Sequence, residues 1–385
     1  MYTQLSEPQL VQTHSISDSA AKYDVFWRSA KWCWDGSAVL ATREDNSLQV
    51  WNDPSALASS SITIPQPAPV LDAVWYPGAR TSDAPSYCFV ASIRDTPIRL
   101  LDGTNGRLRA SYKIIDHVER FVAPHSMAFN CTADKLYCGH RDAIEMFDIQ
   151  YPGEGERIKT SSSKKSKSGM RGIVSSLAFC PDYSGIYAAG SFTSALWLFA
   201  EGQGAQPVCR LKGIASAITQ VRPMLRRISA HATQVKFNPA YPQLLYAACR
   251  QRNSIYAWDT RNPSAPYATY ERKSSTNQKL WIDVDASGTW LVTGGTDGSV
   301  SFFNLTSELE VNEPEHSFHA HDDAVGSVAL HPIEMKLLTV SGSRHFEETA
   351  QVNEGSDSDF KDDVQRHVQR VRPVAFDATM KIWDI

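Results

Sequence analysis

The chain has 385 residues, of which 42% are hydrophobic and 21% charged, an ordinary globular composition that can bury a large core. Ten Trp, fourteen Tyr and fifteen Phe, together with 21 Gly and 20 Pro, favour many short strands and turns and exclude a coiled coil. The formal net charge of -4 excludes a globally positive surface, so nucleic acid would have to contact a local basic patch.

Cysteine usage and hydropathy indicate the compartment. The seven cysteines form no Cys-x-x-Cys pair, and an odd set of this kind fits neither a disulfide framework nor a zinc module. Residues 1–23 are polar, and no later segment approaches the ~20 apolar residues of a membrane span. We therefore expect a soluble, intracellular protein with no membrane partner.

One repeated unit runs along the whole chain, and each copy ends in an aromatic residue or Leu that is followed, in all copies but one, by a polar residue. The endings are Trp51-Asn52, Leu101-Asp102, Phe147-Asp148, Leu198-Phe199, Trp258-Asp259, Phe303-Asn304 and Trp383-Asp384. Their spacing is close to or above the ~40–45 residues of a four-stranded propeller blade. The repeats predict an all-β fold, a seven-bladed β-propeller.

The unit is clearest between residues 280 and 304. Polar and apolar residues alternate up to the Ser287-Gly288 turn, and Asp297-Gly298 marks the next hairpin. Small residues occupy the second strand, as at Gly190 and at Gly294-Gly295, where neighbouring backbones are expected to crowd near the axis.

Closure of the ring requires a strand from the other end of the chain. The last repeat ends on its third strand at Ile385, so we expect a stretch around Gln9 to Ser15 to pair beside Met380 to Ile385 and cover that sheet edge. The predicted organisation is an N-terminal segment, 1–22, that carries the closing strand, followed by the propeller, 23–385.

Three loops depart from the repeat: 152–171, 221–234 and an acidic insert, 347–363. The acidic insert has seven acids and one Lys and should be solvated; Ser356, followed by acids, is a candidate phosphorylation site. Residues 218–222 are echoed at 232–236, and removal of 221–234 restores the period. We interpret that loop as a translated intron or a lineage-specific insertion, which sequencing of the transcript distinguishes.

Four stretches carry a family resemblance: 92–112, 185–199, 276–303 and 341–346. Only Trp258-Asp259 and Trp383-Asp384 are true Trp-Asp pairs, so the repeats are of a degenerate WD type. The sequences of these four stretches resemble the telomerase Cajal body protein 1 family, and the resemblance extends from about Lys31 to Phe346. That resemblance implies a WD40-type RNA-binding propeller that recognises small nuclear RNAs of the H/ACA or C/D class, telomerase RNA among them, together with RNP proteins. It implies a nuclear location, Cajal-body-like or nucleoplasmic, with a cytoplasmic pool left open.

Arginines recur near the turn between the second and third strands of five repeats. They are Arg43, Arg94, Arg141, Arg250 with Arg252, and Arg344. Because these turns lie on the narrow face of a propeller, we predict a ring of cations that binds phosphates and stacks on unpaired bases. The alternative is that the arginines brace their turns or pair with neighbours such as Asp95 and Asp142.

A second basic patch lies in the loop before the fourth repeat, between Arg157 and Arg171. Its candidate RNA contacts are Lys164, Lys165, Lys167 and Arg171. A flexible Lys-rich loop gives salt-dependent attraction without sequence choice. A solvated linker or a weak nuclear-import signal is the favoured reading of this run.

The sequence offers no positive sign of an enzyme, a metal site or a cofactor. Histidines 316, 319, 321 and 331 follow the loop and strand of the seventh repeat, and His321 occupies the place of a structural WD-repeat histidine. Nucleophile-elbow and phosphate-loop motifs are absent from the sequence, and no small-molecule substrate is expected. We expect a nonenzymatic RNA-binding scaffold; the alternatives are a spliceosome-associated WD-repeat factor and a protein-only adaptor of the G-protein β kind.

Overall fold

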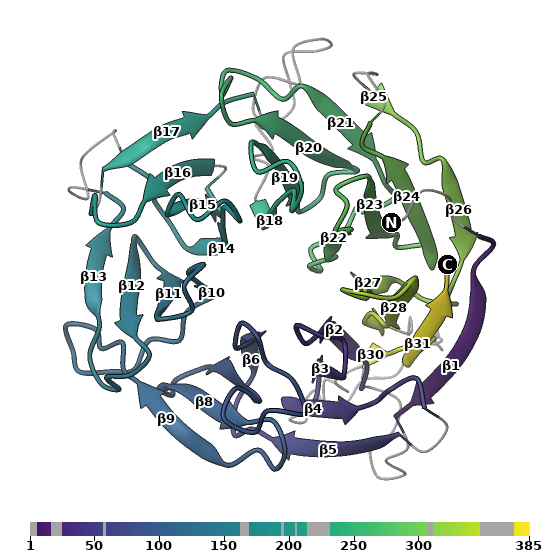
Figure 1. The fold of residues 1–385 in the computed structure, drawn as a ribbon, viewed down its shortest axis with the longest axis horizontal. Helices are drawn as coiled ribbons and strands as arrows, with labels where there is room; N and C mark the ends of the chain where they lie inside the picture. The colour runs from purple at the N-terminus through teal and green to yellow at the C-terminus, as the bar shows by residue number, and fades with distance from the viewer. Residues whose placement is uncertain are drawn as a thin grey trace, which may run out of the picture.

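The computed structural model describes residues 6–16, 25–56, 59–161, 169–193, 196–204, 206–213, 232–306, 311–346 and 373–385. These residues form seven blades around a central axis, each with four antiparallel strands, and one blade gains a fifth, parallel strand (Figure 1). The prediction of an all-β, seven-bladed propeller is confirmed. Within the described ranges, no helix has the length and hydrophobicity that a membrane crossing requires.

The first four blades follow one another along the chain, each from its inner to its outer strand. Blade 1 consists of β2 (Trp27–Trp32), β3 (Ala38–Arg43), β4 (Ser47–Asn52) and β5 (Ser60–Pro65). Blade 2 consists of β6 (Val70–Trp75), β7 (Cys88–Ile93), β8 (Ile98–Asp102) and β9 (Leu108–Tyr112). Blade 3 consists of β10 (Ser126–Phe129), β11 (Lys135–His140), β12 (Ala143–Asp148) and β13 (Glu156–Lys159). Blade 4 consists of β14 (Val174–Phe179), β15 (Ile186–Ser191), β16 (Leu196–Ala200) and β17 (Pro207–Leu211).

The last three blades depart from this pattern in their outer strands. Blade 5 consists of β18 (Ala232–Phe237), β19 (Leu244–Cys249), β20 (Ser254–Asp259) and β21 (Ala268–Glu271), and β25 (Val311–Asn312) adds to it in parallel. Blade 6 consists of β22 (Ile282–Val284), β23 (Trp290–Gly294), β24 (Ser299–Asn304) and β26 (His316–His319). Blade 7 consists of β27 (Val325–Leu330), β28 (Lys336–Ser341), β31 (Thr379–Asp384) and β1 (Gln9–Ser15).

The N-terminal strand closes the ring as predicted. β1 pairs antiparallel with β31, from Gln9 opposite Asp384 to Ser15 opposite Thr379. His14 anchors the strand, because its buried ring lies 4.2 Å from the ring of Trp51 and its Nε2 is 2.9 Å from the carbonyl oxygen of Pro54 in blade 1. The outer edge of blade 7 is therefore covered, and the strand is tied to the neighbouring blade.

Seven hydrophobic clusters hold the blades together, one at each seam between neighbours. The seam between blades 7 and 1 shows the pattern, since Trp27 and Val39 pack in one cluster with Leu338 and Ile382. Second strands such as β3 and β7 are buried along their whole length, whereas the outer strand β5 has exposed and half-buried residues only. A blade contacts partners through both faces, so its stability depends on the complete ring.

Glycines mark the points at which the blades crowd the axis. A Cβ added at Gly190 would lie 2.5 Å from Ser176 Oγ, and one at Gly294 would lie 2.5 Å from the carbonyl oxygen of Val325 in the next blade. The prediction that small residues mark this crowding is confirmed at both positions.

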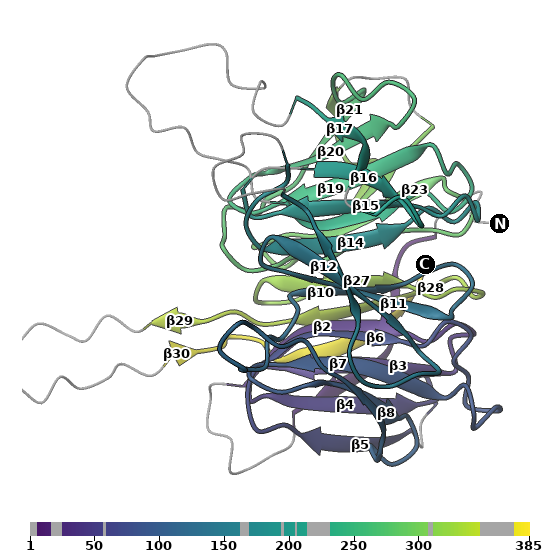
Figure 2. The same ribbon diagram turned by 90° about the vertical axis from the view of Figure 1, so that its left-hand side faces the viewer.

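A two-stranded ribbon projects from blade 7 beyond the body of the disc (Figure 2). Its strands are β29 (His345–Phe346) and β30 (Pro373–Val374), which continue from β28 and lead into β31. The acidic insert 347–363 with Ser356, residues 221–231 of the predicted loop 221–234, and Lys164, Lys165 and Lys167 lie outside the described residues. The last three residues of that predicted loop, 232–234, belong instead to β18, the inner strand of blade 5.

Candidate functional site

A cavity of about 990 Å³ opens at one end of the central channel. Ser343 and Arg344, which directly precede β29, line it, so the cavity lies on the face from which the ribbon of blade 7 projects (Figure 2). Turns between second and third strands and connections into inner strands line it. Its cationic side chains are Arg28, Arg94, Arg250, Lys279 and Arg344, and its carboxylates are Glu44 and Asp72. We call this cavity the cationic mouth.

Three of the six predicted turn arginines meet in the cationic mouth: Arg94, Arg250 and Arg344. Arg94 is exposed, and within the described part of the chain its guanidinium has no hydrogen bond or ion pair. The guanidinium of Arg250 lies 4.8 Å from the ring centroid of Phe192, and its buried Nε has no hydrogen-bond partner among the described residues. Arg344 is exposed and pairs with Glu44.

The other three turn arginines lie elsewhere. Arg43 departs from the expected ring, because it is 3% exposed, pairs with Asp45 at 2.9 Å and packs 5.7 Å from the ring centroid of Trp27. Arg141 is exposed but does not line the mouth, and neither does the half-buried Arg252. Arg141 forms no ion pair with Asp142, and Arg94 none with Asp95, in the part of the chain that the structure describes.

Arg28 and Lys279 belong to the mouth but were missed from the sequence. Arg28 lies on the inner strand β2, and Lys279 lies in the connection that enters β22. The predicted arginines all lie near one type of turn, whereas the same face also receives the connections into the inner strands. An alignment of the repeats on their inner strands would have identified both Arg28 and Lys279.

The charges in the mouth affect one another. Glu44 lies between two arginines, because Arg28 Nε is 3.4 Å from its Oε2 and Arg344 contacts its Oε1. Burial, together with the nearby cations of Arg94, Arg250 and Lys279, lowers the pKa of His125, which also lines the mouth. The mouth therefore keeps a surplus of positive charge even though the whole chain is acidic.

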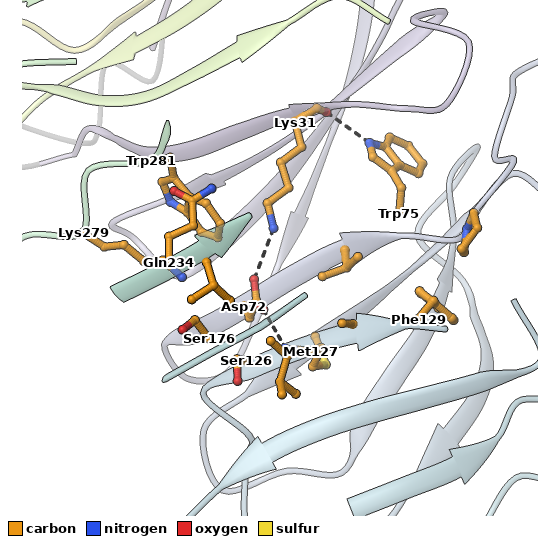
Figure 3. A pocket seen from close by; sticks show the side chains of 15 residues that line it. Lys31, Asp72, Trp75, Ser126, Met127, Phe129, Ser176, Gln234, Lys279 and Trp281 are labelled. Carbon is orange, nitrogen blue, oxygen red and sulfur yellow. Dashed lines mark hydrogen bonds and ion pairs between the residues drawn. The ribbon is translucent and has the colours of Figure 1, made fainter. Parts of the chain in front are cut away.

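Below the mouth, the channel narrows to a cavity of about 320 Å³ (Figure 3). Lys31 Nζ donates to Asp72 Oδ1 at 3.3 Å and to the carbonyl oxygen of Ala73 at 2.7 Å. Asp72, Lys279 and Trp281 line this smaller cavity as well as the mouth, so they mark the place where the two meet. We call this place the neck.

Tyr151 and Arg171, which flank the second basic patch, do not line the mouth. Tyr151, 74% exposed, follows β12 at the end of the blade where Ile149 bonds to Asp134, which is the opposite face of the disc. Phe192, in contrast, is half-buried and lines the mouth. Arg171 is exposed in the connection before β14, and its carbonyl accepts a hydrogen bond from Thr193 Oγ1.

The histidine of blade 7 has the structural role predicted for it. His321 is buried, with Nδ1 2.9 Å from Asp377 Oδ2 and Nε2 2.7 Å from Thr339 Oγ1. Thr339 Oγ1 in turn accepts a hydrogen bond of 2.9 Å from Trp383 Nε1. This chain of hydrogen bonds joins the loop before β27 to strands β28 and β31, and it uses all the polar atoms of the imidazole.

Comparison with known proteins agrees with this architecture. Residues 274–304, which contain β22, β23 and β24, match the family described as WD domain, G-beta repeat. The chain is a WD40-type β-propeller. Among its relatives, Telomerase Cajal body protein 1 of Rattus norvegicus is 32% identical over 349 residues, which is 87% of this chain and 62% of the relative. The same protein of Bos taurus is 29% identical over 383 residues, 96% of this chain and 66% of the relative.

The similarity to the telomerase Cajal body protein 1 family that the sequence predicts is confirmed over most of the chain. The chain spans less than two thirds of the length of the rat and bovine relatives. A further relative, Guanine nucleotide-binding protein negative regulator 1 of Schizosaccharomyces pombe, is 27% identical over 346 residues, which is 85% of this chain and 82% of that protein.

Proposed function

We propose that the protein is a nonenzymatic scaffold that binds small nuclear RNA at the cationic mouth and presents it to RNP proteins. The observation that carries this proposal is the local charge of the mouth, where five cationic side chains meet two carboxylates. An acidic protein with one such patch can attract polyanions to a single place without binding them over its whole surface. The bound RNA is of the H/ACA or C/D class, with telomerase RNA as one member.

The residues of the mouth suit the two chemistries that RNA offers. Arg94 presents free guanidinium donors, which bind phosphate oxygens in pairs. The guanidinium of Arg250 lies over the ring of Phe192, and guanidinium and aromatic groups are both surfaces on which unpaired bases stack. A folded RNA with an unpaired loop offers both groups side by side, whereas a regular duplex hides its bases.

The relatives support the RNP setting. The relative that matches 87% of this chain, from rat, is named Telomerase Cajal body protein 1, a name that refers to telomerase and to the Cajal body. We therefore assign the protein to the nucleus and to telomerase-related or other small nuclear RNPs.

A protein partner is the second candidate, and a specific observation favours it. Phe346 and Phe376, at the root of the blade 7 ribbon, are 65% and 67% exposed, and aromatic side chains are enriched in protein interfaces. The fission yeast relative named as a guanine nucleotide-binding protein negative regulator fits an adaptor of the G-protein β kind. Because cations outnumber carboxylates at the mouth, RNA is a better candidate ligand than a protein partner.

The test combines crosslinking with charge removal. The variant Arg94→Ala, Arg250→Ala, Arg344→Ala should retain at least tenfold less crosslinked RNA than the unmodified chain, because each charge-assisted hydrogen bond contributes about 1.5–3 kcal/mol. The matched control replaces Arg80, Arg107 and Arg210 by Ala, three exposed arginines that do not line the mouth.

Sequencing of the crosslinked RNA separates the readings. Recovery of H/ACA, C/D or telomerase RNAs supports the proposal, and spliceosomal RNAs support a spliceosome-associated factor. Equal RNA retention by both triple variants, or no enriched RNA at all, overturns RNA binding at the mouth and favours the protein adaptor.

A further inference from the structure

The neck contains an ammonium group without an acid to balance it. Lys279 Nζ lies 3.7 Å from the ring centroid of Trp281, and among the described residues it has no hydrogen bond and no ion pair. Lys31 Nζ lies over the same ring, 4.4 Å from its centroid, but is also bound to Asp72 (Figure 3). The two lysines thus differ in that one is neutralised and the other is not.

The nearest carboxylate cannot serve both lysines. Asp72 is 7% exposed, and besides Lys31 its oxygens accept hydrogen bonds from the main-chain N–H of Ala73 at 2.9 Å and of Met127 at 2.9 Å. These bonds hold Asp72 between blades 2 and 3. The carboxylate is therefore already used by the ring itself.

Several other cations act on Lys279. Burial is the main cause that lowers the pKa of Lys279 to about 8; Asp72 opposes this shift, and the charges of Lys31, Arg28 and Arg250 each lower the pKa by a smaller amount. A partly buried ammonium among other cations is unfavourable in the empty protein. An anion in the neck would relieve both the missing hydrogen bonds and the repulsion.

We propose that the neck is a phosphate-binding subsite in which Lys279 pairs with a phosphate group that enters through the cationic mouth. The access route is present, because Lys279 and Trp281 line both the 990 Å³ and the 320 Å³ cavities. Phosphate suits the site better than a carboxylate does, because it offers oxygens to several donors at once, here Lys279 and, from the mouth side, Arg28 and Arg250. The phosphate comes either from a free oxyanion or from RNA, and only the second source rests on the proposed function.

The first experiment uses inorganic phosphate alone. Thermal unfolding of the full chain is followed over a phosphate titration at constant ionic strength, with chloride as the balancing anion. Phosphate should raise the Tm of the unmodified chain, since a ligand that binds only the folded state stabilises it. Lys279→Met should weaken phosphate binding about tenfold to hundredfold, the loss expected for one charge-assisted hydrogen bond, and Lys279→Arg should restore most of it.

The matched control is Lys273→Met, the same substitution in the same connection. Lys273 is exposed, pairs with Asp297 and lines neither cavity, so its phosphate response should equal that of the unmodified chain. A phosphate response of Lys279→Met as large as that of the unmodified chain, or no response in any variant, would overturn the subsite.

The second experiment identifies the source of the phosphate. The amine of Lys279 is acetylated with an N-hydroxysuccinimide ester, with and without a single-stranded oligoribonucleotide, and its modification is read by mass spectrometry against Lys273. Protection by the oligoribonucleotide places an RNA phosphate in the neck. Protection by inorganic phosphate but not by the oligoribonucleotide leaves the subsite in place for a free oxyanion and counts against RNA at the mouth. Lack of protection by either ligand contradicts the subsite.

Discussion

A difference of one residue decides the environment of two of the turn arginines. Arg43 is the last residue of β3 and lies opposite Trp27 in the ladder, so its side chain is held within the blade. In blade 2 the equivalent place, opposite Val70, is taken by Ile93, and Arg94 follows it in the turn. The repeat spacing predicted the turns, but it did not predict whether each arginine ends the strand or begins the turn. A shift of one position in a strand reverses the direction of the side chain.

The unbalanced charge of Lys279 should reduce stability in a pH-dependent way. Its pKa is about 8 in the folded chain against ~10.4 for an unfolded lysine. The unfolded chain therefore binds more protons between pH ~8 and ~10.4, and stability rises with pH across this window. The full penalty, up to about 3 kcal/mol, applies below the window.

Replacing Lys279 by Met removes this penalty. In phosphate-free buffer at neutral pH, chemical denaturation should show Lys279→Met to be more stable than the unmodified chain, by up to about 3 kcal/mol. The difference should shrink as pH approaches ~10.4. Lys273→Met serves as the reference, since its ammonium is exposed and paired. A destabilised Lys279→Met at neutral pH would show that the ammonium is favourably placed in the empty protein.

Among the elements, β1 is the one whose role the sequence showed most directly. The last repeat ends on its third strand, and an unpaired sheet edge has to be covered. The parallel addition of β25 to blade 5 and the ribbon of β29 and β30 were not predicted, because strands of two residues leave no periodic signal. Exposed or half-buried positions such as Leu10 and Val11 also make β1 weakly amphipathic, so topology rather than hydropathy identified it.

Removal of β1 should open the ring. Deleting residues 1–15 eliminates the β1–β31 ladder and the contacts of His14 with Trp51 and Pro54. With several ladder hydrogen bonds lost at about 1 kcal/mol each, the free energy of unfolding should fall by about 3 kcal/mol or more. Thermal and denaturant unfolding measure the change, and deletion of residues 1–5, which precede the strand, is the control. Equal stability of the two deletions would refute the closing role.

At the scale of the whole molecule, the blade number and the cationic face were predictable, but the neck was not. Each blade repeats the same turns, so the repeats alone place the arginine turns on one face. The neck combines Lys31 of blade 1, Asp72 of blade 2 and Lys279 before blade 6, which are distant in the sequence and meet only across the axis. Asp72 pairs with Lys31 rather than with Lys279 because of how these residues are placed across the axis. No local sequence pattern indicates which lysine is paired.

The charge distribution predicts strong salt dependence of RNA binding despite the net charge of -4. If the five cations of the mouth contact phosphates, the logarithm of the binding constant should fall against the logarithm of salt concentration with a slope of about -3.5, at ~0.7 per contact on single strands. The Arg94, Arg250, Arg344 triple variant should reduce the slope by about 2. Filter binding or fluorescence anisotropy over a salt series measures it, and a slope near zero would mean that the mouth does not hold phosphates.

The joining of β1 to β31 also has a consequence for synthesis. β1 leaves the ribosome before all other described strands, and its partner leaves after them. During translation the first strand must wait without its ladder while six blades form behind it. A chain released before β31 is made cannot form the β1–β31 ladder. Such incomplete products keep an unpaired strand edge that chaperones and proteases can detect.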